Sequence, residues 1–283
     1  MLFVSFLEPH SPYNGPLNRE HTLEEVEMEA SATHTFGPDM PLRYRLKQEY
    51  QEREFGTTPD SYRQTKQKYL GLVTQIDRSI GAIIRQLERF GLADDTIVVH
   101  TSDHGDMMGA HRLFEKEVMF DQAARVPYLV RLPGQRRQIR VAQPVSHIDF
   151  APTLLDLLGR PAHPQCAGVS RAPLVRGEAM PAETVFLEWS PNTGKEKVKK
   201  GTALAAEAEI ARAMKESTRT AVTPDGLKLS LRDTDKPELY NVRADPEERH
   251  NLAVRSEHAA VMARLTDEIH RWQERTGDRV RVG

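Results

Sequence analysis

Two side chains that can bind a metal ion, Asp103 and His104, follow an apolar run that begins at Thr96. The run predicts a buried strand over residues 96–101, and ligands of open α/β sheets gather beyond the carboxyl ends of strands. Gly105 lets the backbone turn away at once. A carboxylate suits calcium or magnesium, whereas an imidazole extends the choice to manganese or zinc. The pattern predicts a metal-assisted hydrolase that takes its remaining ligands from elsewhere.

Two other loops carry cationic or titratable side chains. His10 follows the apolar opening run Leu2–Leu7, which predicts another buried strand, and Lys116 lies in an apolar-flanked stretch. Beside a carboxylate-bound metal, such groups would offset the charge of a tetrahedral oxyanion ester. Ordinary roles also fit each residue alone: Asp103 as a cap, His10 as a surface histidine and Lys116 as a solvated lysine.

The elements that must position these side chains can be read from periodicity. Apolar residues at helical spacing predict an amphipathic helix over Tyr62–Phe90, which Gly91 ends as a C-cap. A helix, a short turn and an apolar strand form half of a βαβ unit, which favours a parallel sheet. A second strand is expected at Tyr128–Arg131 and a helix at Phe150–Leu158, whereas residues 17–60 are polar and predict a long surface excursion.

The pattern of predicted elements changes near Pro161. Short strand-like runs surround the turn Pro224-Asp225-Gly226, an alanine-rich helix is expected at Ala203–Lys215, and an amphipathic helix at His258–Arg275. We therefore expect an α/β core over 1–160 and a smaller α+β subdomain over 161–283, with a small antiparallel sheet and a terminal helix.

Composition narrows the class of protein. The chain has 283 residues and a net charge of −2, so bulk charge attracts neither nucleic acid nor membrane. No apolar run approaches the ~20 residues that span a bilayer. The single cysteine, Cys166, excludes an internal disulfide. Without a signal peptide the chain as given is expected to be cytoplasmic, or periplasmic or secreted if an N-terminal part is missing.

The linked motifs, taken in order, are similar to those of the sulfatase family in the alkaline phosphatase superfamily. The resemblance covers the opening residues and most of the chain from residue 60 onward. It is carried by Tyr69–Asp77, Gly91–Gly109, His111, Lys116, Arg125-Val126-Pro127, His147–Gly159, Glu238-Leu239-Tyr240-Asn241, Asp245-Pro246-Glu247-Glu248 and Asn251-Leu252-Ala253. It implies an alkaline-phosphatase-like, mostly parallel sheet flanked by helices and the hydrolysis of sulfate esters.

The resemblance also implies roles for particular residues. Asp103 and His104 would be ligands of a divalent metal, most simply calcium, with magnesium or manganese as alternatives. His10 would contact the sulfate, and Lys116 the sulfate and the leaving oxygen. His111 falls in the active-site loop, where it would protonate the leaving group or contact substrate. The substrate would be a sulfated small molecule or glycan.

Two family features are absent from the sequence. The nucleophile of the family is a formylglycine made within Cys/Ser-x-Pro-x-Arg, a motif this chain lacks, and Cys166 has neither the proline nor the arginine. The family's N-terminal Asp-Asp pair is absent too. The chain thus resembles a sulfatase without its N-terminal part and is predicted to be inactive alone, so that a missing N-terminal segment, a partner chain or a homo-oligomer would complete it.

Two other functions stay open at this point. Phosphonate monoester or phosphodiester hydrolases of the superfamily share the Asp-His pair, and a non-catalytic remnant could bind anions or a partner. Specificity would come from loops, of which 14–60 and 190–218 are candidates. Lys195, Lys197, Lys199 and Lys200 form a basic cluster that would meet an anionic glycan or stay a solvated segment.

Overall fold

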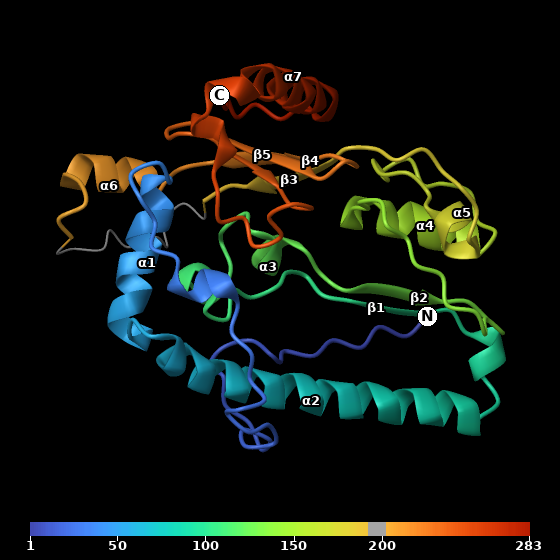
Figure 1. Ribbon diagram of the computed structural model, residues 1–283. Helices are drawn as coiled ribbons and strands as arrows, with labels where there is room; N and C mark the ends of the chain where they lie inside the picture. Colours follow the sequence, from blue (N-terminus) through green and yellow to red (C-terminus); the bar gives the residue numbers. More distant parts are fainter. Residues whose placement is uncertain (192–201) are drawn as a thin grey trace. The chain divides into compact units, whose positions relative to one another are not determined.

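The computed structural model describes residues 1–191 and 202–283, which form two compact units (Figure 1). One unit comprises Met1–Gln135 and residues 202–210, and the other comprises residues 136–191 and Ala211–Gly283. The boundary expected after residue 160 thus falls inside the second unit. The basic cluster of lysines 195–200 lies outside the described residues. No helix among the described residues is long and apolar enough to cross a membrane.

The first unit is built on two helices, α1 (Leu42–Phe55) and α2 (Pro59–Arg89) (Figure 1). Helix α2 is the predicted amphipathic helix and begins earlier than expected, because the Thr58 hydroxyl caps it by accepting from the Ser61 backbone N–H. Helix α1 was expected to be part of the irregular excursion. It buries polar as well as apolar side chains, Arg43, Gln48 and Gln51 among them, so its sequence shows no apolar period.

Strands β1 (Val98–Thr101) and β2 (Tyr128–Arg131) form a two-stranded antiparallel sheet in which Val99 lies opposite Val130. Among the described residues no strands pair in parallel, so the expectation of a mostly parallel sheet is wrong for the pairings seen here. The connection from β1 to β2 contains only the short α3 (Asp121–Ala124) and one 3-10 turn, and no helix long enough for a crossover. The predicted burial of β1 is also wrong, since its residues are half-buried or exposed.

The predicted opening strand is absent. Residues 1–7 form no strand, and Leu2 and Phe3 are 80% and 84% exposed. An apolar run becomes a buried strand only when a neighbour pairs with its backbone, and no strand of the described chain does so.

The core of the first unit is aromatic. Tyr13, Tyr62, Leu72, Met108 and Phe114 form one cluster, against which Phe55 and Tyr69 pack. This cluster brings the segment after His10, helix α2 and the loop before Lys116 into contact. The apolar contacts therefore hold together the parts of the chain that carry the predicted site.

The second unit contains a four-stranded antiparallel sheet in the order β3 (Val185–Trp189), β4 (Thr218–Val222), β5 (Leu227–Arg232) and β6 (Glu238–Asn241). The turn between β4 and β5 contains Gly226, whose φ of +91° is left-handed and suits glycine. Helix α7 (Ala259–Thr276) packs on this sheet, and two short helices, α4 (Phe150–Leu157) and α5 (Ala172–Arg176), precede it (Figure 1). Helix α6 (Glu207–Ala213) contains the boundary between the two units in the sequence, which falls between Ile210 and Ala211.

Alternation along β5 separates two chemistries. Leu229 and Leu231 join the core with α7, whereas Lys228 and Arg232 point to the other face and are also buried. Arg232 donates to Glu216 at 2.9 Å and to Glu238. These charges are paired, as buried charges must be.

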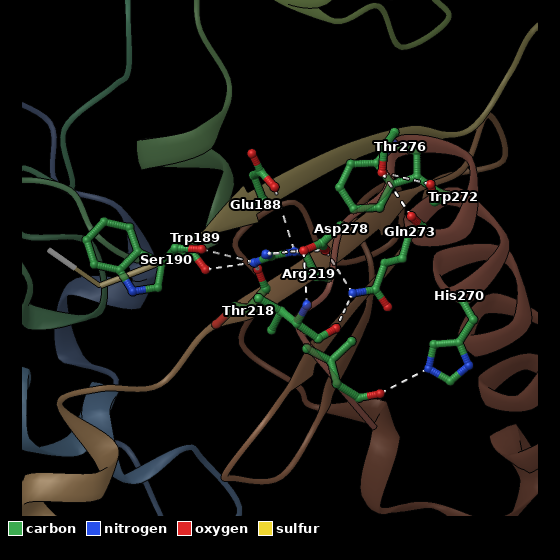
Figure 2. A network of polar contacts seen from close by, with 12 residues as sticks. Glu188, Trp189, Ser190, Thr218, Arg219, His270, Trp272, Gln273, Thr276 and Asp278 are labelled. Atoms are coloured by element: carbon green, nitrogen blue, oxygen red, sulfur yellow. Dashed lines mark hydrogen bonds and ion pairs between the residues drawn. The ribbon is translucent and has the colours of Figure 1, made fainter. Parts of the chain in front are cut away.

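Arg219 of β4 ties the chain after α7 to the sheet (Figure 2). Its guanidinium donates to Asp278 at 2.6 and 3.0 Å and to the Trp189 carbonyl oxygen at 3.0 Å. Gln273 donates to the same carboxylate at 2.8 Å. Hydrogen bonding from Arg219 is the main cause that holds the pKa of Asp278 well below its usual range.

Candidate active site

Asp103 and His104 lie in a turn that directly follows β1. Asp103 Oδ1 accepts from the His104 backbone N–H at 3.0 Å and from the Ser102 hydroxyl at 3.3 Å. His104 Nδ1 lies 2.8 Å from the Gly105 carbonyl oxygen, and because a carbonyl can only accept, Nδ1 carries the proton. His104 Nε2 is then a lone-pair nitrogen, 3.5 Å from Asp103 Oδ2. One oxygen and one nitrogen thus face the same space.

The electrostatics of this turn favour an ionised carboxylate. Burial raises the pKa of Asp103, but the positive charge of the His104 ring when it is protonated and the hydrogen bonds from the His104 and Asp103 backbone and the Ser102 side chain outweigh it and lower the pKa overall. Asp103 is therefore charged at neutral pH, which is the form that binds a cation.

Gly105 allows the turn after β1 to approach the backbone of α3 closely. Its backbone N–H donates to the Ala123 carbonyl oxygen at 2.8 Å, and a Cβ atom at this position would lie 2.1 Å from the Gln122 carbonyl oxygen. The sequence indicated a glycine that frees the turn, whereas the structure shows one that lets the turn pack against α3.

His10 and Lys116 meet although they are far apart in the sequence. Lys116 Nζ lies 2.8 Å from His10 Nε2. His10 Nδ1 lies 2.8 Å from the Ser11 carbonyl oxygen and therefore carries the ring proton, so Nε2 accepts from the ammonium. His10 is exposed and Lys116 half-buried, which leaves the pair open to solvent. Two of the predicted site residues are thus brought together.

Asp106 joins the three loops that carry these residues. Its Oδ2 accepts from the Tyr13 hydroxyl at 2.7 Å, and its Oδ1 accepts from the backbone N–H groups of Glu115 at 2.8 Å and Met108 at 3.1 Å. Within the described chain, no hydrogen bond or ion pair links Asp103 or His104 directly to His10 or Lys116. The connection runs through Asp106, which the sequence reasoning did not single out, although its place three residues after Asp103 could have suggested it.

His111 occupies a different environment. It is fully buried, stacks on Phe120 with ring centroids 4.1 Å apart, and its Nδ1 lies 2.9 Å from Nδ1 of His34. Its φ of +52° places it in a left-handed turn whose carbonyl accepts from Gln48. Its complete burial argues against the expected contact with substrate and for a structural role in the aromatic core.

The donor set of Asp103 and His104 fits part of a metal site. A carboxylate oxygen and a lone-pair imidazole nitrogen are adequate ligands for a divalent ion, but calcium takes six to eight oxygens. Among the described residues, no group of three or more His, Cys, Asp or Glu side chains is arranged to hold a metal. Further ligands would have to come from waters, from substrate or from other polypeptide.

Comparison with known proteins gives a consistent set of relatives. The chain is 30% identical over 271 residues to a choline-sulfatase of Rhizobium meliloti (strain 1021), with 94% of this chain and 48% of the relative covered. It is 27% identical over 224 residues to an N-acetylglucosamine-6-O-sulfatase of Bacteroides thetaiotaomicron, with 77% and 37% covered. The chain thus spans about half the length or less of these two curated relatives.

Solved structures extend the likeness to the fold. The phosphonate monoester hydrolase of Agrobacterium radiobacter superposes with a TM-score of 0.74 at 23% identity, covering 96% of this chain and 56% of that one. A 2-O GAG sulfatase gives a TM-score of 0.74 at 22% identity, covering 99% and 57%. At these identities the likeness concerns the fold alone, which is alkaline-phosphatase-like as expected.

The family is shown by a further match. The Sulfatase family model matches residues 1–160, a span that includes the His10 loop, the turn after β1 and Lys116. The motifs, the fold and this match agree, and the chain belongs to the sulfatase family.

Proposed function

We propose that this chain supplies one part of the active site of a sulfate ester hydrolase. The part consists of an anion-binding pair, His10 and Lys116, and two metal ligands, Asp103 and His104. The observation that carries the proposal is the 2.8 Å contact between Lys116 Nζ and His10 Nε2, made between residues of two separate loops in a chain of this family.

The pair has the chemistry of an oxyanion receptor. The Lys116 ammonium is a point charge with three donor hydrogens, one of which His10 accepts, so the others remain for the oxygens of a sulfate group. The same ammonium can hold a proton near the leaving oxygen as charge develops there. His10 orients the ammonium, because its Nδ1 proton is committed to the Ser11 carbonyl oxygen.

A divalent metal would be held by Asp103 Oδ2 and His104 Nε2, together with ligands from elsewhere. When bound, such an ion polarises ester oxygens and offsets negative charge. Calcium suits the carboxylate, and magnesium or manganese are the alternatives. The chain carries no Cys/Ser-x-Pro-x-Arg motif, so we assign it no nucleophile.

The test separates binding from turnover. The purified chain, incubated with an aryl sulfate and calcium, should give no product above the blank because it lacks the nucleophile. It should still bind inorganic sulfate in a calorimetric titration, and Lys116→Met should weaken this binding. Lys47→Met is a matched control, since Lys47 pairs with Glu117 at 3.1 Å in the same unit. Turnover by the chain alone would refute the inactivity, and equal sulfate binding by both variants would refute the anion pair.

We infer the substrate class from the relatives. Their names, choline-sulfatase and N-acetylglucosamine-6-O-sulfatase, support a sulfated small molecule or a sulfated glycan as the substrate of the complete site. Competition between inorganic sulfate and choline sulfate or glucosamine 6-sulfate, measured on the same chain, tests this class. A sulfated compound that displaces sulfate would support it, and failure of both would contradict it.

A second activity is favoured by one specific observation. The phosphonate monoester hydrolase matches the fold with the same TM-score as the 2-O GAG sulfatase. Hydrolysis of a phosphonate monoester or phosphodiester therefore competes with sulfate ester hydrolysis. Titration of the chain with methylphosphonate and with sulfate discriminates them, since the tighter anion identifies the class that the pair prefers.

A further inference from the structure

We propose that Asp106 is a positioning residue for the anion pair and that its hydrogen bond with Tyr13 sets the geometry of His10 against Lys116. The inference rests on the proposed function of that pair and adds to it a residue that contacts neither the anion nor the metal ligands' donor atoms. It concerns the means by which two loops distant in the sequence keep a 2.8 Å contact at an exposed place.

The Asp106 carboxylate uses both oxygens on two different loops. Oδ2 accepts from the Tyr13 hydroxyl at 2.7 Å, three residues after His10 in the chain. Oδ1 accepts from the Glu115 backbone N–H at 2.8 Å, immediately before Lys116. At 2.7 and 2.8 Å, these two hydrogen bonds are at the short end of the usual range. One side chain therefore fixes both members of the pair through their neighbours.

Other contacts confine the same two loops but do not replace Asp106. The Met107 N–H donates to the Glu115 carbonyl oxygen at 2.8 Å, which supports the Lys116 side. The Ser11 hydroxyl donates to Glu115 Oε1 at 3.4 Å, a long bond. The Tyr13–Asp106 bond is thus the shortest side-chain link between the His10 loop and the rest of the site.

The hydroxyl of Tyr13 is held in place and stays protonated. Its side chain is 8% exposed and its ring meets Tyr69 edge-on with centroids 6.0 Å apart. Burial, and after it the charge and hydrogen bond of Asp106, raise the pKa of Tyr13 well above its usual range. Because the donor is buried and neutral, loss of its partner would leave a polar group unpaired rather than solvated.

A purely structural carboxylate would stabilise the unit without changing the His10 ring, so the test reads the ring directly. In the wild-type chain, ¹⁵N NMR should show His10 with a protonated Nδ1 and an accepting Nε2, assigned by comparison with His10→Gln. Tyr13→Phe keeps the buried ring and removes only the hydroxyl. It should shift the His10 ¹⁵N resonances toward an averaged tautomer and weaken sulfate binding about tenfold, the size of one charge-assisted hydrogen bond.

Two further variants keep the result interpretable. Asp106→Asn retains the shape but not the charge and should shift the same resonances in the same direction. Tyr69→Phe is the matched control, because the Tyr69 ring packs beside Tyr13 and its hydroxyl has no hydrogen-bond partner among the described residues. It should leave the His10 resonances and the sulfate affinity unchanged. Circular dichroism melts identify any variant that fails to fold, and Tyr13→Phe remains decisive if Asp106→Asn does.

The outcomes separate this inference from the proposed function. Unchanged His10 resonances in a folded Tyr13→Phe chain would overturn the positioning role, whether or not the chain binds sulfate. If Tyr13→Phe shifts the His10 resonances but the wild-type chain binds no sulfate, the positioning role stands and the anion site is overturned. If Tyr69→Phe shifts the His10 resonances as much as Tyr13→Phe does, the positioning role is also overturned, since general packing would then explain both effects.

Discussion

The two units differ in how they use an amphipathic helix. In the second unit, Leu265 and Ile269 of α7 are fully buried against the apolar face of the antiparallel sheet. In the first unit, helix α2 is also amphipathic, yet none of its residues after Leu72 in the sequence is buried, and Val73 is 39% exposed. The most exposed apolar side chains of that unit lie within its first seven residues: Met1, Leu2, Phe3 and Leu7. The second unit thus covers the apolar face of α7, whereas the first leaves the apolar face of α2 uncovered after Leu72.

This difference bears on where function resides. An apolar period in a sequence specifies which face of a helix avoids water, but it does not specify what covers that face. The candidate site lies in the unit that leaves the α2 face uncovered, and among the described residues its two proposed metal ligands belong to no group of three or more His, Cys, Asp or Glu side chains that could hold a metal. The chain spans about half the length of these curated relatives. The second unit, by contrast, satisfies its buried charges internally.

The largest effect should come from breaking that internal pairing. Arg232→Met leaves the buried carboxylates of Glu216 and Glu238 without their partner, which should cost about 3–5 kcal/mol of unfolding free energy. Both tryptophans, Trp189 and Trp272, belong to the second unit, so their fluorescence in urea follows that unit.

The control for this prediction is a solvent-exposed ion pair of the same unit. Arg176→Met breaks a pair with Asp156 in which both side chains are 42% exposed, and it should cost less than about 1 kcal/mol. Equal costs for Arg232→Met and Arg176→Met would show that the second unit does not depend on its buried charges.

Local structure could be predicted well from the sequence, but which strands pair and which helix faces are buried could not. The long helix before β1, the strand ending ahead of Asp103 and the turn at Gly226 follow from period and turn chemistry, which are local. The opening strand at Leu2–Leu7 and the parallel pairing failed because strand pairing depends on distant partners. Helix α1 failed because its buried face is polar.

The site divides in the same way. His10 and Lys116 were expected to lie close together, and in the structure their side chains are in contact. His111 was expected to face substrate, yet a ring flanked by Phe36 and Phe120 in the folded chain is buried. Asp106 was overlooked because its place three residues after Asp103 marks it only as a neighbour of the candidate ligands, whereas its three acceptor contacts depend on the fold.

A pair of truncations compares the two helices directly. Leu265→Ala opens a cavity in the covered unit and should cost about 2–5 kcal/mol. Val73→Ala removes an exposed group from α2 and should change the unfolding free energy by less than about 0.5 kcal/mol. Hydrogen exchange of the α7 and α2 amides measures each effect in its own helix. A large cost at Val73 would mean that α2 is covered in solution.

A smaller effect is expected from the carboxylate that holds the chain after α7. Asp278→Asn keeps the shape and removes the charge that Arg219 pairs, for a cost of about 1–3 kcal/mol. Because the folded-state pKa of Asp278 is lowered, its stabilisation is complete above its unfolded pKa of about 4 and is lost as the pH falls further. The wild-type and variant unfolding curves should therefore differ at pH 7 and converge in strong acid. A difference that persists unchanged at low pH would assign the stabilisation to packing instead.

The smallest change in stability should occur where the first unit is most open. Phe3 is 84% exposed, so Phe3→Ser should alter the unfolding free energy by less than about 0.5 kcal/mol while removing apolar surface from water. Dye binding by the chain and its tendency to self-associate should both fall, because contiguous exposed apolar side chains promote each. Sedimentation and the fluorescence of an apolar dye measure the two effects, with Val254→Ser as a control, since Val254 is 64% exposed in the second unit. If Phe3→Ser instead lowers stability by more than about 2 kcal/mol, the opening segment packs against the unit in solution, and the contrast between a covered and an uncovered unit fails at its clearest point.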